Sequence, residues 1–278
     1  MAANRQLKVR KGARKVNEIP SEVLDLLNRG EIETVNLVEW LAIDLQALAR
    51  HVLPQVGLAR AIAPILRDVE ALTKTTTPQV MLAISQGIFR ELQEHKDAAA
   101  ICKLISTHQS DSVRCWGAYL IGLNPKLTLE QKIEQIEIFA ADSHFGVREI
   151  AWMSVRPEIA TDLAKAIELL EGWVSNSDES IRRFATEATR PRGVWCKHIE
   201  QLKSNPELAL PLLEPLKSDP SKYVQDSVGN WLNDASKSQP DWVIALCQRW
   251  LEQCDRKETH RIATKAQRTL ANIKKKAS

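Results

Sequence analysis

Apolar residues recur along most of the chain at spacings of three and four positions, which is the pattern of helices that bury one face. Val147, Ile150 and Ala151 form one such run. Further amphipathic stretches cover residues 129–141, 160–175 and 240–253. Because no segment alternates strictly between apolar and polar residues, we predict an all-α protein with essentially no sheet.

The helical pattern repeats along the chain. Four segments share a hydrophobic start, and their aligned apolar positions are Val113, Val147, Ile181 and Val224. The first three positions are 34 residues apart, whereas the fourth follows after 43, so we place an insertion in the Pro-rich turn at 205–211. An earlier copy begins near Val80 and a degenerate last copy near Ile262.

Each copy carries signals for the start of a helix, and two carry signals for its end. The N-cap candidates are Asp111 or Ser112, Ser143, Ser177 or Asp178, and Ser221. Two copies end in Arg-Pro, at Pro157 and Pro191, and a proline there is expected to stop the helix. A copy and its neighbouring amphipathic stretch form a helix pair. We therefore predict a single domain of HEAT-like helical repeats over residues 17–278, stacked as an α-α superhelix.

Composition and charge narrow the function classes. No run approaches the 18 apolar residues that suggest a membrane span. Five cysteines without a CxxC pair predict a reducing, cytoplasmic environment, and the six histidines form no metal-ligand spacing with them, so we expect no metal site. Residues 1–15 carry +6 and residues 256–278 carry +7, whereas the region between carries −10. Basic ends suit a polyanionic partner, although residues 1–16 read equally well as a disordered basic arm.

A row of arginines follows the repeat. Arg114, Arg148 and Arg182 occupy the same position in three successive copies, and Gln225 replaces arginine in the fourth. Since equivalent positions of stacked helices face the same way, these arginines would line one groove as a basic stripe. The alternative, which the sequence leaves open, is that they pair with acids of the next repeat.

Tryptophans and carboxylates supply the candidate chemistry. Eight of the fourteen aromatic residues are tryptophan, and such rings serve either as core anchors or as surfaces on which bases stack. Glu187 and Asp234 lie where repeat helices should be apolar or neutral, and Glu149 lies one repeat earlier. Converging carboxylates could stabilise a positive transition state or activate a water, as the loss of a base from a sugar requires. Salt bridges with nearby arginines are the alternative.

Two segments, IRRFATEATRPRGVW at 181–195 and VQDSVGNWLNDASKSQPDWV at 224–243, resemble the bacterial DNA alkylation repair glycosylases of the AlkC/AlkD superfamily, most closely its AlkC branch. The resemblance implies a C-shaped solenoid that grips duplex DNA. It also implies excision of positively charged alkylated bases such as 3-methyladenine, with no metal or nucleotide cofactor. Two positions depart from the pattern. Trp152 and Met153 stand where an acid is expected in the preceding repeat, and Gln225 stands where arginine is preferred.

The resemblance also implies roles for individual residues. The acids would stabilise the sugar cation and position the attacking water, the basic residues would contact phosphates, and the indoles would pack against the lesion or its deoxyribose. The predicted catalytic residues are Glu187, Asp234 and Glu149. The predicted DNA-binding residues are Arg114, Arg148, Arg182, Arg183, Arg190, Arg192 and Lys237. The predicted lesion-stacking residues are Trp152, Trp195 and Trp231.

Three functions remain open at this stage. The leading hypothesis is a monomeric DNA glycosylase, a hydrolase of base excision repair that acts on double-stranded DNA in the nucleoid of a bacterial cytoplasm. The second is a catalytically silent HEAT-repeat protein that binds damaged or branched DNA. The third is a protein–protein scaffold, a common role of such arrays.

Overall fold

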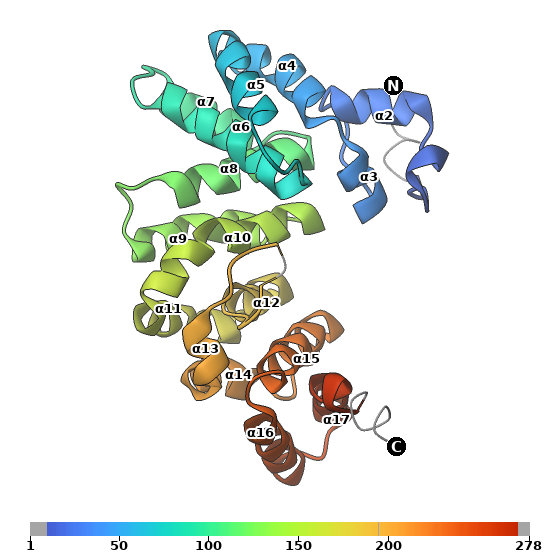
Figure 1. Ribbon diagram of the computed structural model, residues 1–278, viewed down its shortest axis with the longest axis vertical. Coiled ribbons are helices and arrows are strands. Elements are labelled where there is room, and N and C mark those ends of the chain that lie inside the picture. Colours follow the sequence, from blue (N-terminus) through green and yellow to red (C-terminus); the bar gives the residue numbers. More distant parts are fainter. Residues whose placement is uncertain (1–9, 194, 272–278) are drawn as a thin grey trace. The chain divides into compact units, whose positions relative to one another are not determined.

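The computed structural model describes residues 10–193 and 195–271 of the chain. Within those ranges the regular elements are helices, with no strand (Figure 1). This confirms the predicted all-α class. Among the same residues, no helix is both long and apolar enough to cross a bilayer.

The chain forms two compact units. The first comprises Met1–Leu127 and Asp142–Ser154, and the second comprises Thr128–Ala141 and Val155–Ser278. Helix α10 (Phe145–Thr161) contributes its first part to one unit and its last part to the other.

The first unit consists of helices packed around α8 (Asp111–Leu123), in which almost every residue is buried. Its further helices are α2 (Ser21–Asn28), α3 (Leu37–Ala42), α4 (Leu45–Gln55), α5 (Ile62–Glu70), α6 (Thr77–Leu92) and α7 (Ala98–Ser106), with 3-10 turns η1 (Val16–Glu18) and η2 (Ala59–Ala61). Helix α6 packs against α5 and α8, and α7 packs against α8. Met81, Ile84 and Trp116 on these helices have no exposed surface.

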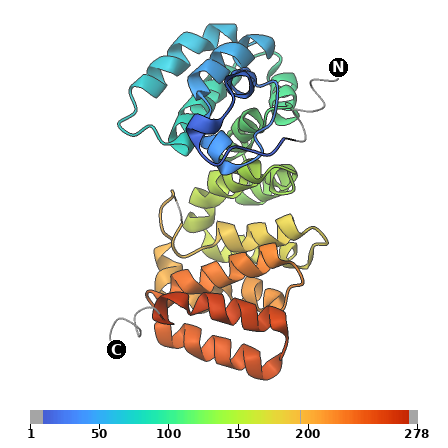
Figure 2. The same ribbon diagram turned by 90° about the vertical axis from the view of Figure 1, so that its right-hand side faces the viewer.

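The second unit is built around one long helix. Its elements are α9 (Leu129–Ala140), α11 (Leu163–Leu170), η3 (Trp173–Ser175), α12 (Glu179–Ala188), α13 (Glu200–Ser204), η4 (Pro206–Ala209), α14 (Leu210–Leu213), η5 (Glu214–Leu216), α15 (Lys222–Ser236), α16 (Pro240–Gln253) and α17 (Lys257–Ala266). Helix α15 packs against α12, α16 and α17 (Figure 2). Trp231 of α15 and Trp250 of α16 are fully buried in this packing.

The repeat register is confirmed by where helices begin. Helices α6, α8, α10, α12, α15 and α17 correspond to the six predicted copies. Their aligned apolar residues are buried, for example Val113, Val147 and Val224 with no exposed surface. Asp178 and Ser221 cap α12 and α15 as predicted, whereas the residue before α8 is Ser110, one position earlier than predicted.

Two local expectations are wrong. Pro157 does not stop its helix, because α10 continues through it to Thr161. The apolar residues on both sides of that proline, Val155 and Ile159, are fully buried, and this burial favours the continued helix over the bond lost at the proline. The insertion at 205–211 is not a turn but part of a series of short helices from α13 to η5.

The charged ends fall partly outside the described residues. Residues 1–9 of the predicted basic arm and the basic residues at 272–278 are not described. Arg10, the first described residue, is held against the first unit. Its Nη2 donates to Oε2 of Glu39 at 2.6 Å and to the carbonyl of Glu33 at 2.8 Å.

The aligned arginines share one contact. In each case the side chain turns back and donates to backbone carbonyls five and six residues earlier, in the loop before its own helix. The Nη1 atoms of Arg114, Arg148 and Arg182 do so at 2.6–3.2 Å. Gln225 keeps one of these bonds, from Nε2 to the carbonyl of Asp219 at 2.7 Å. The position therefore fixes the loop between consecutive helices.

Two of these arginines also hold the next repeat. Arg114 binds Asp142 through Nε and Nη2 at 2.7 and 3.0 Å, and Arg182 binds Asp219 through the same atoms at 2.7 and 3.0 Å. Each aspartate precedes the next repeat helix. This is the pairing with neighbouring acids that the sequence left open.

The loop bond and the acid pair predict a stability role for Arg182. We expect Arg182→Ala to lower the free energy of unfolding by about 2 kcal/mol, because Asp219 would stay buried without its partner. Arg182→Gln should lose less, since Gln225 shows that glutamine keeps the carbonyl bond. Urea unfolding measures both variants. Lys165→Ala, in an exposed pair on α11, should leave the unfolding midpoint unchanged, and an equally unaffected Arg182→Ala would contradict the assignment.

Candidate active site

Two of the three predicted acids lie in the second unit. Glu187 lies in the last turn of α12 and Asp234 in the last turn of α15, and these helices pack against each other. Each residue is 3% exposed. Two buried carboxylates repel each other and are costly to desolvate unless cations lie beside them.

Arg190, two residues beyond α12, supplies that cation to both acids. Its Nη1 donates to Oε2 of Glu187 at 3.3 Å, and its Nε and Nη2 donate to Oδ2 of Asp234 at 2.9 and 2.6 Å. Burial alone would lower the pKa of Arg190, but the charges and hydrogen bonds of the two acids outweigh it and raise the pKa. The guanidinium is therefore a permanent positive bridge between the two helices.

Further cations surround the same acids. Lys237 Nζ donates to Oδ1 of Asp234 at 2.9 Å, and Arg183 Nη2 lies 3.5 Å from Oε1 of Glu187. Arg192 donates from Nε to the backbone carbonyl of Asp234 at 3.3 Å. We call Glu187, Arg190, Asp234 and Lys237 the carboxylate cluster.

Two hydroxyl groups orient Glu187. Ser227 Oγ donates to Oε1 of Glu187 at 2.7 Å, and Thr186 Oγ1 lies 2.6 Å from the same serine oxygen. Because Ser227 comes from α15 and Glu187 from α12, the bond joins the two helices a second time. Neither hydroxyl residue is among the predicted site residues, and their only signal in the sequence is their place in the two segments that resemble the family.

The tryptophans predicted to stack on a lesion have different surroundings. Trp195 is 55% exposed and has a positive φ of 61°, unlike the other described non-glycine residues. Trp231 has no exposed surface, and its indole donates to the carbonyl of Thr189 at 3.0 Å. The ring of Trp231 therefore belongs to the core. Of the two predicted stacking residues in the second unit, Trp195 is the one whose side chain is exposed.

Glu149 and Trp152 lie in the first unit. Trp152 is 4% exposed, and its Nε1 donates to Oε2 of Glu149 at 2.9 Å. The structure thus brings Glu187 and Asp234 together with Arg190 in one unit, while the third predicted acid has an indole partner in the other.

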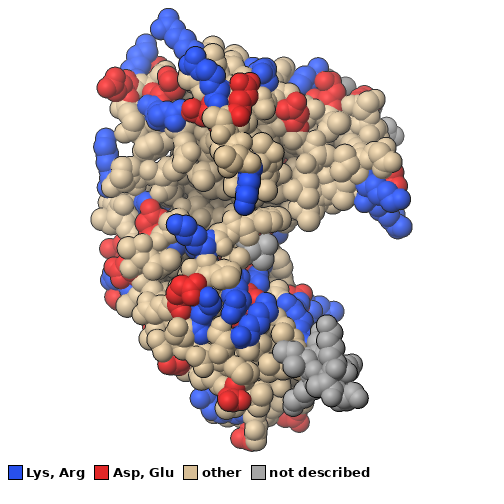
Figure 3. All heavy atoms as spheres, viewed as in Figure 1, with Lys and Arg blue, Asp and Glu red and all other residues tan. Residues whose placement is uncertain are grey.

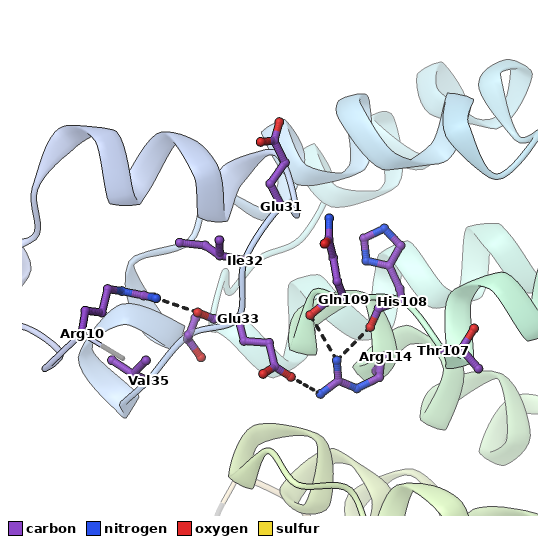
Figure 4. Close-up of a pocket in the computed structure, with 10 residues that line it drawn as sticks. Arg10, Glu31, Ile32, Glu33, Val35, Thr107, His108, Gln109 and Arg114 are labelled. Carbon is purple, nitrogen blue, oxygen red and sulfur yellow. Dashed lines mark hydrogen bonds and ion pairs between the residues drawn. The ribbon is translucent and has the colours of Figure 1, made fainter. Parts of the chain in front are cut away.

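Arg114 lies beside a pocket of about 520 Å³ in the first unit. Figure 4 shows Glu33 of this pocket between Arg10 and Arg114. Arg114 donates to His108, Gln109, Glu33 and Asp142, so all five of its N–H groups have protein acceptors. The contacts of Arg114 and Arg182 hold neighbouring repeats together, so these two arginines are engaged within the protein rather than available to bind DNA.

Positive side chains, lysines and arginines, gather in the second unit, around α12 and α15, on the face drawn in Figure 3. Arg183 lies on α12, Arg190 and Arg192 follow that helix, and Lys237 follows α15. No group of three or more His, Cys, Asp or Glu side chains among the described residues is arranged to hold a metal ion.

Comparison with known sequences identifies relatives. Residues 83–269 match the sequence family described as DNA alkylation repair enzyme. The protein YhaZ of Bacillus subtilis (strain 168) is 40% identical over 121 residues, which are 44% of this chain and 32% of YhaZ. The chain therefore matches only about a third of the length of that relative.

Two solved structures share the fold. The alkylpurine DNA glycosylase AlkC of Pseudomonas fluorescens, bound to DNA containing an abasic site analog, matches with a TM-score of 0.67 at 21% identity, over 94% of this chain and 66% of AlkC. The protein smu.31 of Streptococcus mutans UA159 matches with a TM-score of 0.53 at 23% identity, over 80% of this chain and 98% of smu.31. The helical-repeat fold is thereby confirmed.

The Arg190 bridge predicts a strong coupling between two positions. We expect Arg190→Met to lower the free energy of unfolding by about 3 kcal/mol, because two buried carboxylates lose their shared partner. Adding Asp234→Asn should recover part of that loss, since one stranded charge disappears. Urea unfolding of the wild type, both single variants and the double variant gives the coupling free energy. Losses that add within about 0.5 kcal/mol would show that the bridge does not form in solution.

Proposed function

The chain belongs to the family of DNA alkylation repair enzymes, and we propose from this premise that it is a DNA glycosylase. It would excise positively charged alkylated bases, such as 3-methyladenine, from duplex DNA in base excision repair. The observation that carries the proposal is the carboxylate cluster, in which Glu187 and Asp234 are fixed by Arg190 within the segment that matches the family. The fold shared with AlkC supports it.

The proposed reaction is a hydrolysis at the deoxyribose C1′ atom. The bond from C1′ to the base nitrogen breaks, and its electron pair leaves with the base, which becomes neutral. The sugar is left with an oxocarbenium-like positive charge, which a nearby carboxylate stabilises. Water then adds to C1′ and gives up a proton to a carboxylate or to solvent. The products are an abasic site and a free base, so the reaction needs no cofactor.

The cluster suits this reaction because its charges are set before DNA binds. Donors from Arg190, Lys237 and Ser227 hold the carboxylate oxygens in place. Fixed charges stabilise a developing charge without the cost of reorienting solvent, which makes this kind of electrostatic effect large in enzymes. Glu187 and Asp234 are the acids that we assign to the sugar cation and the water.

The surrounding cations suit a DNA duplex. Arg183, Arg192 and Lys237 lie around the two acids, and guanidinium and ammonium groups bind phosphates. We assign them to the phosphates that flank the lesion, and we assign the exposed ring of Trp195 to the lesion itself. The protein would act as a monomer on the nucleoid DNA of the cytoplasm.

The burial of the two acids also favours a second function, DNA binding without catalysis. Both acids are 3% exposed and ion-paired, which also suits a purely structural bridge. A protein that recognises damaged or branched DNA without cutting the base would keep the surrounding cations and use the acids only to join α12 to α15.

Base release separates the two functions. We expect Glu187→Gln and Asp234→Asn each to reduce base release by about 100-fold, because each removes one fixed charge from the site of the sugar cation. Their affinity for duplex DNA should not fall, since neither acid binds a phosphate. The measurement is incubation with methylated genomic DNA, followed by chromatography of the released bases.

A matched control for these variants is Glu200→Gln, an exposed acid on α13 that should release bases at the wild-type rate. Normal release by both Glu187→Gln and Asp234→Asn would remove these acids from the reaction. A wild-type chain that binds duplex DNA but releases no base would favour the silent DNA-binding protein.

Salt dependence tests the DNA interface. The logarithm of the association constant should fall linearly with the logarithm of salt concentration, with a slope of about −0.9 for each phosphate contact. Lys237→Gln should reduce the magnitude of that slope by about 1, whereas Lys165→Gln on α11 should leave it unchanged. Fluorescence anisotropy of labelled duplex DNA measures the slope. Absent or salt-independent binding would favour a protein–protein scaffold.

A further inference from the structure

Arg156 is a buried cation that the proposed reaction does not use. Only 2% of its surface is exposed. Its Nη1 donates to the carbonyl of Ala188 at 2.7 Å and its Nη2 to the carbonyl of Arg190 at 2.6 Å. Its Nε and Nη2 also donate to the carbonyl of Lys197, at 3.3 and 3.2 Å. Among the described residues, its hydrogen-bond acceptors are therefore backbone carbonyls rather than carboxylates.

Two of these carbonyls precede Trp195 and one follows it, at a loop of which residues 189–193 and 195–199 are described and which we call the Trp195 loop. Ala188 ends α12, where carbonyls lack partners within the helix. Arg190 is the residue whose side chain joins the two acids, and Lys197 lies across the loop. A second tie, from the amide of Ile199 to the carbonyl of Pro191 at 3.0 Å, closes the same loop.

The Trp195 loop lies directly on the Arg156 guanidinium. A Cβ atom added to Gly193 would lie 2.1 Å from Sγ of Cys196 and 3.2 Å from both Nε and Nη2 of Arg156. A side chain at this position would therefore have to displace the Cys196 thiol within the loop, and it would also crowd the guanidinium by a few tenths of an ångström, so it would disturb the loop where it meets Arg156. Because Gly193 has no side chain, its backbone can lie this close to the guanidinium of Arg156.

Trp195 is held in a strained conformation at the surface of this loop. Its φ of 61° lies in the left-handed region, which is unfavourable for a residue with a Cβ atom. Such a conformation persists when the surrounding structure over-determines it. The hydrogen bonds on both sides of Trp195, to Arg190 and to Lys197, provide that constraint.

Arg156 and Arg190 occupy the same position in successive repeats. They are 34 residues apart, and each stands before a proline. Each guanidinium reaches the end of the next repeat helix. Arg156 binds the carbonyls of Ala188 and Arg190, and Arg190 binds the side chain of Asp234. Arg156 thus fixes the backbone of Arg190, and the side chain of Arg190 in turn fixes the two acids.

We propose that Arg156 is a positioning residue, which fixes the Trp195 loop and thereby holds Arg190 against the acids and Trp195 toward the DNA. The proposal rests on the proposed glycosylase function for what the loop does, but its geometry does not depend on that function.

The first test is Arg156→Lys, which keeps the charge but lacks the planar fork that binds carbonyls on both sides of the loop. We expect the single-turnover rate of base release to fall by about 100-fold, since small displacements of positioned groups have effects of that size. The dissociation constant for duplex DNA should change little. Arg249→Lys, at an exposed site on α16, is the matched control and should keep the wild-type rate.

The second test does not need catalysis. Acrylamide quenching of Trp195 fluorescence is obtained as the difference between each chain and the same chain with Trp195→Phe. Arg156→Lys and Gly193→Ala should both increase this quenching, while circular dichroism shows a folded helical protein. Gly193→Ala keeps the Arg156 guanidinium, so it tests the positioning role of the loop contact even if Arg156→Lys does not fold.

The outcomes separate the two proposals. If folded Arg156→Lys and Gly193→Ala chains keep the wild-type quenching of Trp195 and the wild-type rate, the positioning role is overturned. If the wild-type chain releases no base from methylated DNA, the glycosylase proposal fails. In that case increased quenching in both variants still supports the positioning role, and unchanged quenching overturns it.

Discussion

A single guanidinium group carries the constraint on which the candidate site depends. Glu187 and Asp234 are negatively charged, nearly buried and contributed by different repeats, so their approach is unfavourable without a cation between them. Arg190 follows α12 closely enough to reach back to Glu187 and across to Asp234. The two acids can therefore keep this arrangement only while α12 stays packed on α15. A displacement of either helix would break the bridge and take from the two buried carboxylates the cation that they share.

The repeat provides two arginine positions with different tasks. The first-turn position of Arg114, Arg148 and Arg182 binds the loop before its own helix, and in Arg114 and Arg182 it also binds the acid that precedes the next one. The position before a proline, held by Arg156 and Arg190, reaches forward to the end of the next repeat helix. Most of these guanidinium groups stabilise the stack. Around Glu187 and Asp234 the same architecture gathers Arg183, Arg192 and Lys237, and Trp195 is exposed in the loop that follows α12.

The sequence predicted the features that depend on the register of the repeat, and it left open those that depend on the direction in which a side chain points. Its 34-residue spacing located the repeat helices and placed Glu187 and Asp234 on neighbouring ones, because burial of apolar positions determines both. It did not determine whether Arg182 faces a groove or its own loop, since a long side chain chooses among acceptors that only the folded backbone presents. The burial of Trp231 and the passage of α10 through Pro157 likewise depend on neighbouring helices. Arg156 shares an Arg-Pro signal with Arg190, but the carbonyls that it binds carry no mark in the sequence.

The chemistry of the cluster restricts the base that the proposed glycosylase could release. A neutral base is a poor leaving group and must be protonated by a general acid as its bond breaks. The oxygens of Glu187 and Asp234 accept hydrogen bonds from Arg190, Lys237 and Ser227, so they are arranged as charged acceptors and not as proton donors. A base that already carries a positive charge needs no acid and requires only that the sugar cation be stabilised. For the proposed glycosylase, the arrangement that lets two carboxylates remain buried would thus also favour cationic lesions over neutral ones.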